Sequence, residues 1–229
     1  MSAIPPSQEA STMISAPILR ILHPKLESNA AELVAQNLQT AARRFEINTQ
    51  RRVAHFLAQL AHESGFRPLA ENLNYSAEGL RKTWPRVFTE QLALECQRNP
   101  ERIANLAYGH RLGNTQPEDG FKFRGRGFIQ ITGRNNYTRY GALIRQDIVN
   151  NPDLALQVDV SSLIAAAFWL ENGLNQLADE GGIEVVEAIT KKVNGGTLGL
   201  DERRRYFLLA EQALGSSAAG NTQFIEGSP

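Results

Sequence analysis

The pair His62-Glu63, within Ala-His-Glu-Ser-Gly-Phe (61–66), is the first place in this sequence where side chains could do chemistry. Zinc proteases carry a similar pair, but they also need a second histidine three residues after the glutamate. Position 66 is a phenylalanine, and the chain has only four histidines in all. The sequence therefore predicts neither a metal site nor a cofactor.

Glu63 lies at the edge of the apolar face of the helix that carries it. Val53, Phe56, Leu57 and Leu60 form one stripe, and at about 100° per residue Glu63 lies roughly 80° from the centre of that stripe. Partial loss of water and the negative end of a helix dipole both favour the protonated form of a carboxyl group, which a general acid requires. An ordinary surface glutamate would fit the same position, so the helix alone leaves the role open.

A second carboxylate, Glu71, follows eight residues later in Glu-Asn-Leu-Asn-Tyr (71–75). Because Gly65 and Pro68 intervene, Glu71 belongs to a loop that leaves the helix. One carboxylate on a helix and one on the adjoining loop are the minimum equipment for hydrolysing a glycosidic bond. A loop glutamate that is merely solvated has the same spacing.

Residues 122–133 are rich in glycine and basic side chains, with the sequence Lys-Phe-Arg-Gly-Arg-Gly-Phe-Ile-Gln-Ile-Thr-Gly. The alternation over 128–132 predicts an extended segment with the Gln130 amide and the Thr132 hydroxyl on one face, where they could position water or sugar hydroxyls. A loop with its isoleucines in the core is the alternative. A phosphate-binding loop is excluded, since Gly-Lys-Ser/Thr is absent. Basic and aromatic residues would also suit nucleic acid, but the balanced charge of the whole chain argues against that partner.

Towards the C-terminus, Asn194-Gly-Gly ends one helix, and Arg203, Arg204 and Arg205 lie near the start of the next. By default the first motif is a helix C-cap and the second a solvated face. Neither indicates a function by itself.

In this order and spacing, the motifs resemble glycoside hydrolase family 19, which contains plant-type chitinases and endolysins of bacteriophages and bacteria. The matching blocks are AHES, ENLNY, FRGRGFIQITG and VNGG with the basic helix, and they run from Ala61 to about Gly215. Plant members carry disulfides, which the single cysteine Cys96 cannot form, and their base lies further from the acid in sequence. Both departures favour the endolysin branch.

The resemblance implies a role for each matched residue. Glu63 corresponds to the general acid, Glu71 to the general base, and Thr132 to the residue that helps hold the attacking water. The residues implied to contact substrate are His62, Tyr75, Gln130, Asn194 and, chosen from three consecutive arginines, Arg203.

The resemblance also implies the reaction, namely inverting cleavage of β-1,4 bonds in bacterial peptidoglycan. A chitinase acting on N-acetylglucosamine polymers is the alternative among enzymes. An inactive relative that only binds carbohydrate is the alternative outside them, and the presence of both Glu63 and Glu71 argues against it.

The elements that must position these residues are helical. Apolar spacing is helical nearly everywhere between residues 17 and 215, and Ser161–Asn172, apolar on almost every side, predicts a buried central helix. The fold class is therefore mostly α, with little or no β-sheet, and the resemblance implies a lysozyme-like helical bundle with a substrate cleft. One catalytic domain is expected over 17–215, with flexible tails over 1–16 and 216–229.

Several helix starts are marked by capping residues, whose side chains satisfy free backbone N–H groups. They are Asn48 or Thr49, Ser76, Thr89 and Asn99, the last followed by Pro100. Gly65 and Gly109 are expected to end two of these helices.

Composition limits the remaining possibilities. The 229 residues include 24 Lys plus Arg and 24 Asp plus Glu, so no net charge draws the chain to nucleic acid or to anionic lipid. No run approaches the ~20 apolar residues of a membrane span, and from the first residues we expect no secretory signal. We expect a monomer, made in the cytoplasm, that acts on the cell wall after release, with no membrane or nucleic-acid partner.

Overall fold

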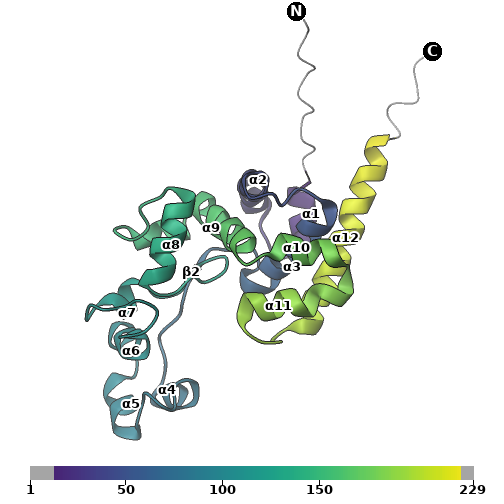
Figure 1. Cartoon of the computed structure of the whole chain (residues 1–229). Helices are drawn as coiled ribbons and strands as arrows, with labels where there is room; N and C mark the ends of the chain where they lie inside the picture. The colour runs from purple at the N-terminus through teal and green to yellow at the C-terminus, as the bar shows by residue number, and fades with distance from the viewer. Residues whose placement is uncertain (1–12, 223–229) are drawn as a thin grey trace, which may run out of the picture.

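The computed structural model describes residues 13–222, which form a bundle of helices with two very short strands (Figure 1). The predicted fold class, mostly α with little β-sheet, is confirmed. The helices are α1 (Ala16–Leu22), α2 (Ser28–Arg44), α3 (Gln50–Ser64), α4 (Ala77–Thr83), α5 (Glu90–Cys96), α6 (Pro100–Tyr108), α7 (Asp119–Lys122), α8 (Arg134–Ile144), α9 (Val158–Glu171), α10 (Leu174–Glu180), α11 (Val186–Asn194) and α12 (Leu200–Thr222). Two 3₁₀ helices, η1 (Pro152–Leu156) and η2 (Ile183–Val185), lie in the connections.

Side-chain caps begin the helices α3 to α6 at the residues that the sequence predicts. The Thr49 side chain accepts a hydrogen bond from the N–H of Arg52 at 3.2 Å, and Gly65, with φ +56°, ends α3. The same kind of side-chain cap begins the next three helices, at Ser76, Thr89 and Asn99. The capping of α3 defines the helical turn that carries Glu63.

A large core joins most of the helices. α12 packs along α3, and α9 packs against α2. The expected buried central helix is α9, whose Trp169 ring meets Phe56 of α3 edge-on at 5.3 Å between centroids. The end of α3 is therefore held firmly by the interior of the molecule.

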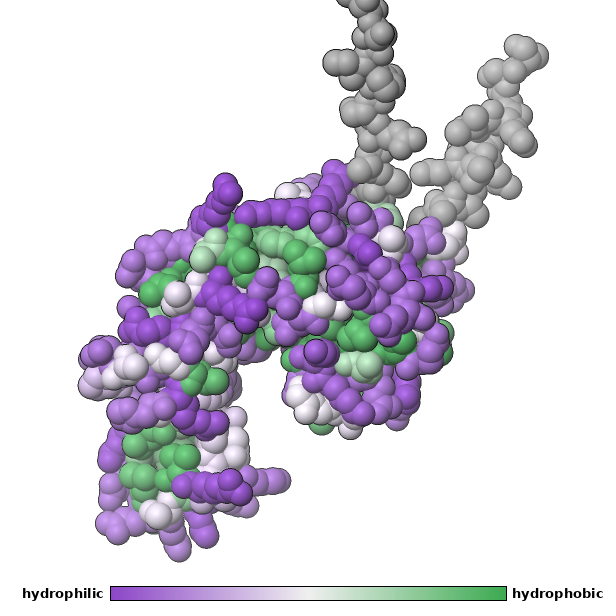
Figure 2. Space-filling view, in the orientation of Figure 1, coloured by the Kyte–Doolittle hydropathy of each residue, from purple (hydrophilic) through white to green (hydrophobic). Residues whose placement is uncertain are grey.

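A second, smaller core lies within α4–α6, here called the small lobe. It consists of eight buried residues, with Trp84 packed against them: Leu73, Leu80, Phe88, Ala93, Cys96, Ile103, Ala104 and Ala107. Figure 2 shows a deep hollow between this lobe and the part of the molecule that contains α11. Two separately packed units thus form the walls of the hollow.

The strands β1 (Leu69–Ala70) and β2 (Arg126–Gly127) pair antiparallel, with Ala70 opposite Arg126. The prediction of an extended segment over 128–132 is wrong. Residues 128–130 form a turn, Gln130 has φ +54°, and Ile131 returns to make a single bridge with Arg126. The chain can reverse here because Gly127, with φ +88°, adopts a conformation that side chains disfavour.

The ends of the folded region differ from the expected boundaries. Ile14 is 1% exposed, and the N–H groups of Met13 and Ile14 both donate to Oε1 of Gln39 at 2.9 and 2.8 Å, so residues 13–16 are packed. The last helix continues to Thr222, beyond the expected limit of 215. The rest of the two expected tails, residues 1–12 and 223–229, lies outside the described residues. Within 13–222, no helix combines the length and apolar character needed to cross a membrane.

Candidate active site

Glu63 lies in the last turn of α3, with its side chain 19% exposed. This is the partly buried position that the helical spacing predicts. Its Oε1 accepts a hydrogen bond from Nη2 of Arg203 at 2.5 Å. No hydrogen bond from the described residues reaches Oε2 of Glu63, so this oxygen can meet a ligand.

The structure distinguishes the three consecutive arginines. Arg203 is 1% exposed and faces α3. Arg204 and Arg205 lie further out and make longer ion pairs, with Glu187 at 3.6 Å and with Glu202 at 3.9 Å. Arg203 is therefore the arginine beside Glu63, because α12 presents only this one of the three to the interior.

His62 is tied to the start of α12. Its Nδ1 lies 2.7 Å from Oε2 of Glu202, and this hydrogen bond holds the pKa of the Glu202 carboxyl below its usual range. Gly199 packs so closely on the imidazole that a Cβ added there would lie 2.0 Å from the ring. His62, on α3 and next to Glu63, is thus packed against the start of α12.

Asn194 is the last residue of α11 and is exposed, and Gly195, with φ +76°, caps the helix. Its Oδ1 accepts from the N–H of Gly196 at 2.8 Å, and its Nδ2 donates to the carbonyl of Leu198 at 3.2 Å. The same carbonyl accepts from Nε of Arg203 at 3.2 Å. Asn194 therefore shapes the loop that borders the Arg203–Glu63 pair.

Glu71 follows β1 directly, and both of its carboxylate oxygens have donors. Tyr108 of α6 donates its hydroxyl proton to Oε1 at 2.5 Å, and the N–H of Gly125 donates to Oε2 at 3.2 Å. Burial, followed by the hydrogen bond to Glu71, raises the pKa of the Tyr108 phenol far above its usual range. Tyr108 is thus a permanent donor that fixes the carboxylate.

Gly125 is the point around which three candidate residues gather. A Cβ added to it would lie 3.3 Å from Cβ of Glu71, 3.3 Å from Oγ1 of Thr132 and 3.0 Å from Oε1 of Gln130. The Gln130 Nε2 donates to the carbonyl of Leu69 at 2.6 Å, which links the turn to β1. Glu71, Thr132 and Gln130 are brought together, although their segments lie about sixty residues apart.

Tyr75 belongs to an aromatic cluster of the small lobe. Its ring meets Trp84 edge-on at 5.1 Å, and Trp84 meets Tyr108 at 6.2 Å. The cluster connects the candidate substrate residue Tyr75 to the tyrosine that holds Glu71. Tyr108 lies in none of the sequence motifs and 37 residues from Glu71, so no local spacing could have identified it.

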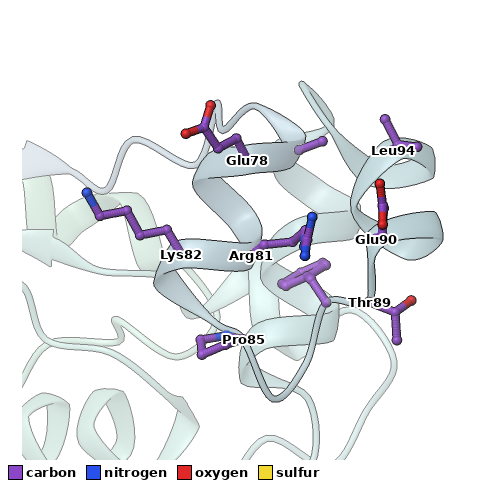
Figure 3. A pocket seen from close by; sticks show the side chains of 9 residues that line it. Glu78, Arg81, Lys82, Pro85, Thr89, Glu90 and Leu94 are labelled. Atoms are coloured by element: carbon purple, nitrogen blue, oxygen red, sulfur yellow. The ribbon is translucent and has the colours of Figure 1, made fainter.

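Within the described residues, no three side chains of His, Cys, Asp or Glu gather as they would around a metal ion. A separate pocket of about 550 Å³ lies between α4 and α5 (Figure 3). It is lined by Ala77, Glu78, Arg81, Lys82, Pro85, Phe88, Thr89, Glu90 and Leu94. None of the candidate residues lines it, so it is distinct from the region around Glu63 and Glu71.

Comparison with known sequences gives a family match. The family model described as Chitinase class I matches residues 30–179, which include both glutamates, Gln130 and Thr132. A glycosyl hydrolase family 19 domain-containing protein of Haemophilus influenzae is 42% identical over 158 residues, covering 67% of this chain and 76% of that protein. The acidic endochitinase Q of Nicotiana tabacum is 45% identical over 56 residues, covering 24% of this chain and 22% of its own.

Comparison with solved structures gives the same fold. Chitinase C from Streptomyces griseus superposes with a TM-score of 0.55 at 19% identity, over 90% of this chain and 78% of that one. A bacterial family 19 chitinase superposes with a TM-score of 0.54 at 20% identity, over 86% and 95%.

Proposed function

This chain belongs to glycoside hydrolase family 19, and from that membership we propose that it hydrolyses β-1,4 bonds of an amino-sugar polymer with inversion at the anomeric carbon. Glu63 is the proposed general acid and Glu71 the proposed general base. One observation carries the proposal: the two carboxylates are anchored separately, Glu63 by Arg203 in the large core and Glu71 by Tyr108 in the small lobe.

Inversion requires a proton donor and a proton acceptor on opposite faces of the sugar. Glu63 donates its proton to the glycosidic oxygen as the bond from this oxygen to the anomeric carbon breaks. Glu71 accepts a proton from water as the water oxygen attacks that carbon from the other face. The Thr132 hydroxyl, beside Glu71 across Gly125, helps to hold the water. Exchange with solvent returns the proton from Glu71 to Glu63.

Bacterial peptidoglycan is the proposed polymer, and a cation without a carboxylate partner supports it. Arg126 and Arg134 form ion pairs with Asp153 and Asp119. Arg124 lies next to Gly125 and has no carboxylate partner among the described residues; its Nη1 donates to the carbonyl of Phe121 at 3.0 Å. A guanidinium close to the proposed base that pairs with no carboxylate of the described residues favours a substrate that carries carboxylates, as peptidoglycan does.

Chitin is the second candidate. The tobacco relative is named an endochitinase and the Streptomyces griseus structure is a chitinase. Chitin has the same β-1,4 linkage but carries no carboxylate, so it cannot form an ion pair with Arg124.

Digestion of both polymers separates the two candidates. Purified peptidoglycan and N-acetylglucosamine hexamer are incubated with the protein, and the fragments are identified by mass spectrometry. We expect disaccharide-peptide fragments from peptidoglycan, and Arg124→Gln should lower the rate on peptidoglycan more than on the hexamer. Cleavage of the hexamer alone would assign the protein to chitin.

The stereochemistry tests the mechanism independently of the polymer. Proton NMR of the first product follows the anomeric proton before mutarotation. Inversion predicts that the α-anomer appears first from a β-linked substrate. An initial β-anomer means retention, and would remove Glu71 from the role of base.

A further inference from the structure

A buried amide, Gln59, lies behind the Arg203–Glu63 pair. Gln59 is on α3, one turn before Glu63, and is 2% exposed. Its Oε1 accepts a hydrogen bond from Nη1 of Arg203 at 2.5 Å, while Nη2 of the same guanidinium binds Glu63. Arg203 therefore bridges two side chains of one helix face, because residues four apart are neighbours on a helix.

Thr190 of α11 determines which way the Gln59 amide points. The Thr190 hydroxyl donates its single proton to the carbonyl of Val186 at 2.7 Å. It can then only accept from Gln59, whose Nε2 lies 3.3 Å away. With Nε2 committed to Thr190, Oε1 of Gln59 must face Arg203, where it is an acceptor for the guanidinium.

The Arg203 guanidinium is consequently fixed in three directions. Nε donates to the carbonyl of Leu198, Nη1 to Gln59 and Nη2 to Glu63. A planar guanidinium held at two of these points presents Nη2 in one orientation only. Gln59 is neutral, so it orients Arg203 without competing with Glu63 for its charge.

From these contacts we propose that Gln59, oriented by Thr190, is a positioning residue for the proposed acid Glu63 and acts through Arg203. The inference rests on the proposed function. It extends the acid side of the site from the partly buried carboxylate back into the junction of α3, α11 and α12.

The test is the turnover number of Gln59→Met, which keeps the length of the side chain and removes both hydrogen bonds. We expect kcat to fall about 10–100-fold, the usual effect of losing a buried hydrogen bond to a charged group, with KM changed less than about twofold. Thr190→Val leaves the Gln59 amide free to flip, and should have a smaller effect in the same direction. Gln59→Glu should lower kcat as well, because a carboxylate at this position draws Arg203 away from Glu63.

A double variant separates positioning from a structural role. If Gln59 acts only through Glu63, adding Gln59→Met to Glu63→Gln should lower kcat no further. A structural defect would lower kcat by the same factor in both backgrounds. Gln39→Met is the matched control. Like Gln59, Gln39 is a buried amide, but it lies on α2 and its Oε1 accepts hydrogen bonds from backbone N–H groups. It should lower the melting temperature and leave kcat of the folded protein unchanged.

Peptidoglycan and N-acetylglucosamine hexamer are the probes, and the polymer that the wild type hydrolyses is used throughout. If kcat of Gln59→Met stays within twofold of wild type, or falls equally in the Glu63→Gln background, the inference is wrong and the proposed function stands. If Glu63→Gln keeps full activity, or neither polymer is hydrolysed, the proposed function itself fails, and the inference with it.

Discussion

Each proposed catalytic carboxylate has a partner of a different chemical kind. Glu63 is paired with a guanidinium that is nearly inaccessible to solvent, whereas Glu71 is held by a phenol and a backbone N–H. Arg203 carries a full positive charge, whereas the Tyr108 hydroxyl and the Gly125 N–H are uncharged dipoles. The two glutamates, identical in type, thus lie in different surroundings.

Tyr108→Phe tests the support of Glu71. The variant removes the donor to Oε1 and keeps the ring that packs on Trp84. We expect kcat to fall roughly tenfold, the effect of losing one hydrogen bond to a charged group, with the melting temperature changed little. Tyr140→Phe, a buried tyrosine of α8, is the control and should leave kcat unchanged. Unchanged turnover in Tyr108→Phe would show that Gly125 alone suffices to orient Glu71.

His55 makes the stability of the protein depend on pH. It is fully buried, its Nε2 lies 3.1 Å from the carbonyl of Gly181, and burial lowers its pKa from 6.5 to about 4. Between these values the unfolded chain binds a proton that the folded protein does not. Above about pH 6.5 His55 is neutral in both states and leaves the free energy of unfolding unchanged. As the pH falls from there to about 4, protonation of the unfolded chain lowers the free energy of unfolding by about 3 kcal/mol.

Urea unfolding at pH 7 and at pH 4.5 measures this dependence. His55→Gln keeps a donor for the Gly181 carbonyl but cannot titrate, so it should lose clearly less stability between the two pH values than wild type. An equal loss in both proteins would mean that other groups cause the acid sensitivity.

Among the elements, the β1–β2 pair acts as a clamp that holds the proposed base, Glu71. Its register places Glu71 opposite Gly125, with the N–H of Glu71 donating to the Gly125 carbonyl at 2.8 Å. Only two residues of each strand pair. So short a sheet adds little to the core. Its main effect is to hold the loop after α3 against the glycine-rich segment.

Gly125→Ala should damage this clamp without unfolding the protein. The added methyl group would meet Glu71, Thr132 and Gln130 at 3.0–3.3 Å, so these side chains must move by a few tenths of an ångström. Because small misplacements of reacting groups are costly, we expect kcat to fall roughly tenfold. Steady-state kinetics and the melting temperature are measured together. Full activity with an intact fold would show that these groups need not be gathered so closely.

Gly215→Ala is the control for adding a methyl group. Gly215 lies within α12, and a Cβ there would meet nothing within 4 Å. Alanine is favoured over glycine inside a helix by about 1 kcal/mol, so this variant should be slightly more stable and equally active.

At the scale of the whole molecule, the walls of the hollow have cores of unequal size. The small lobe is held by eight buried residues, whereas α3, α9 and α12 share a core that extends through the rest of the protein. Local opening requires less free energy where fewer apolar contacts are broken. The wall that carries Tyr108 should therefore open more often than the wall that carries Arg203.

Native-state hydrogen exchange measures this difference directly. We expect the protected amides of α6 to exchange at least about tenfold faster than those of α3, under conditions where the whole molecule remains folded. Equal protection of the two helices would mean that both cores unfold as one cooperative unit.

The sequence by itself determined the helical class, the starts of α3 to α6 and the candidate motifs. Caps such as Thr49 and Asn99 act on backbone groups three residues away, and the apolar period repeats every turn, so both can be recognised in a short stretch of chain. The partial burial of Glu63 was predictable for the same reason, because its angle on α3 follows from its neighbours.

Only the tertiary structure decided which groups meet. Arg203 is 140 residues from Glu63, and Tyr108 is 37 residues from Glu71. The alternation over 128–132 suited a strand. Only residues 126–127 pair with β1, and with positive φ at Gly127 and Gln130 the chain turns back so that Ile131 bridges to Arg126. Contacts of this kind arise when helices and loops distant in sequence pack against each other to bury apolar surface. The spacing of residues along the chain does not predict which of these segments will pack together.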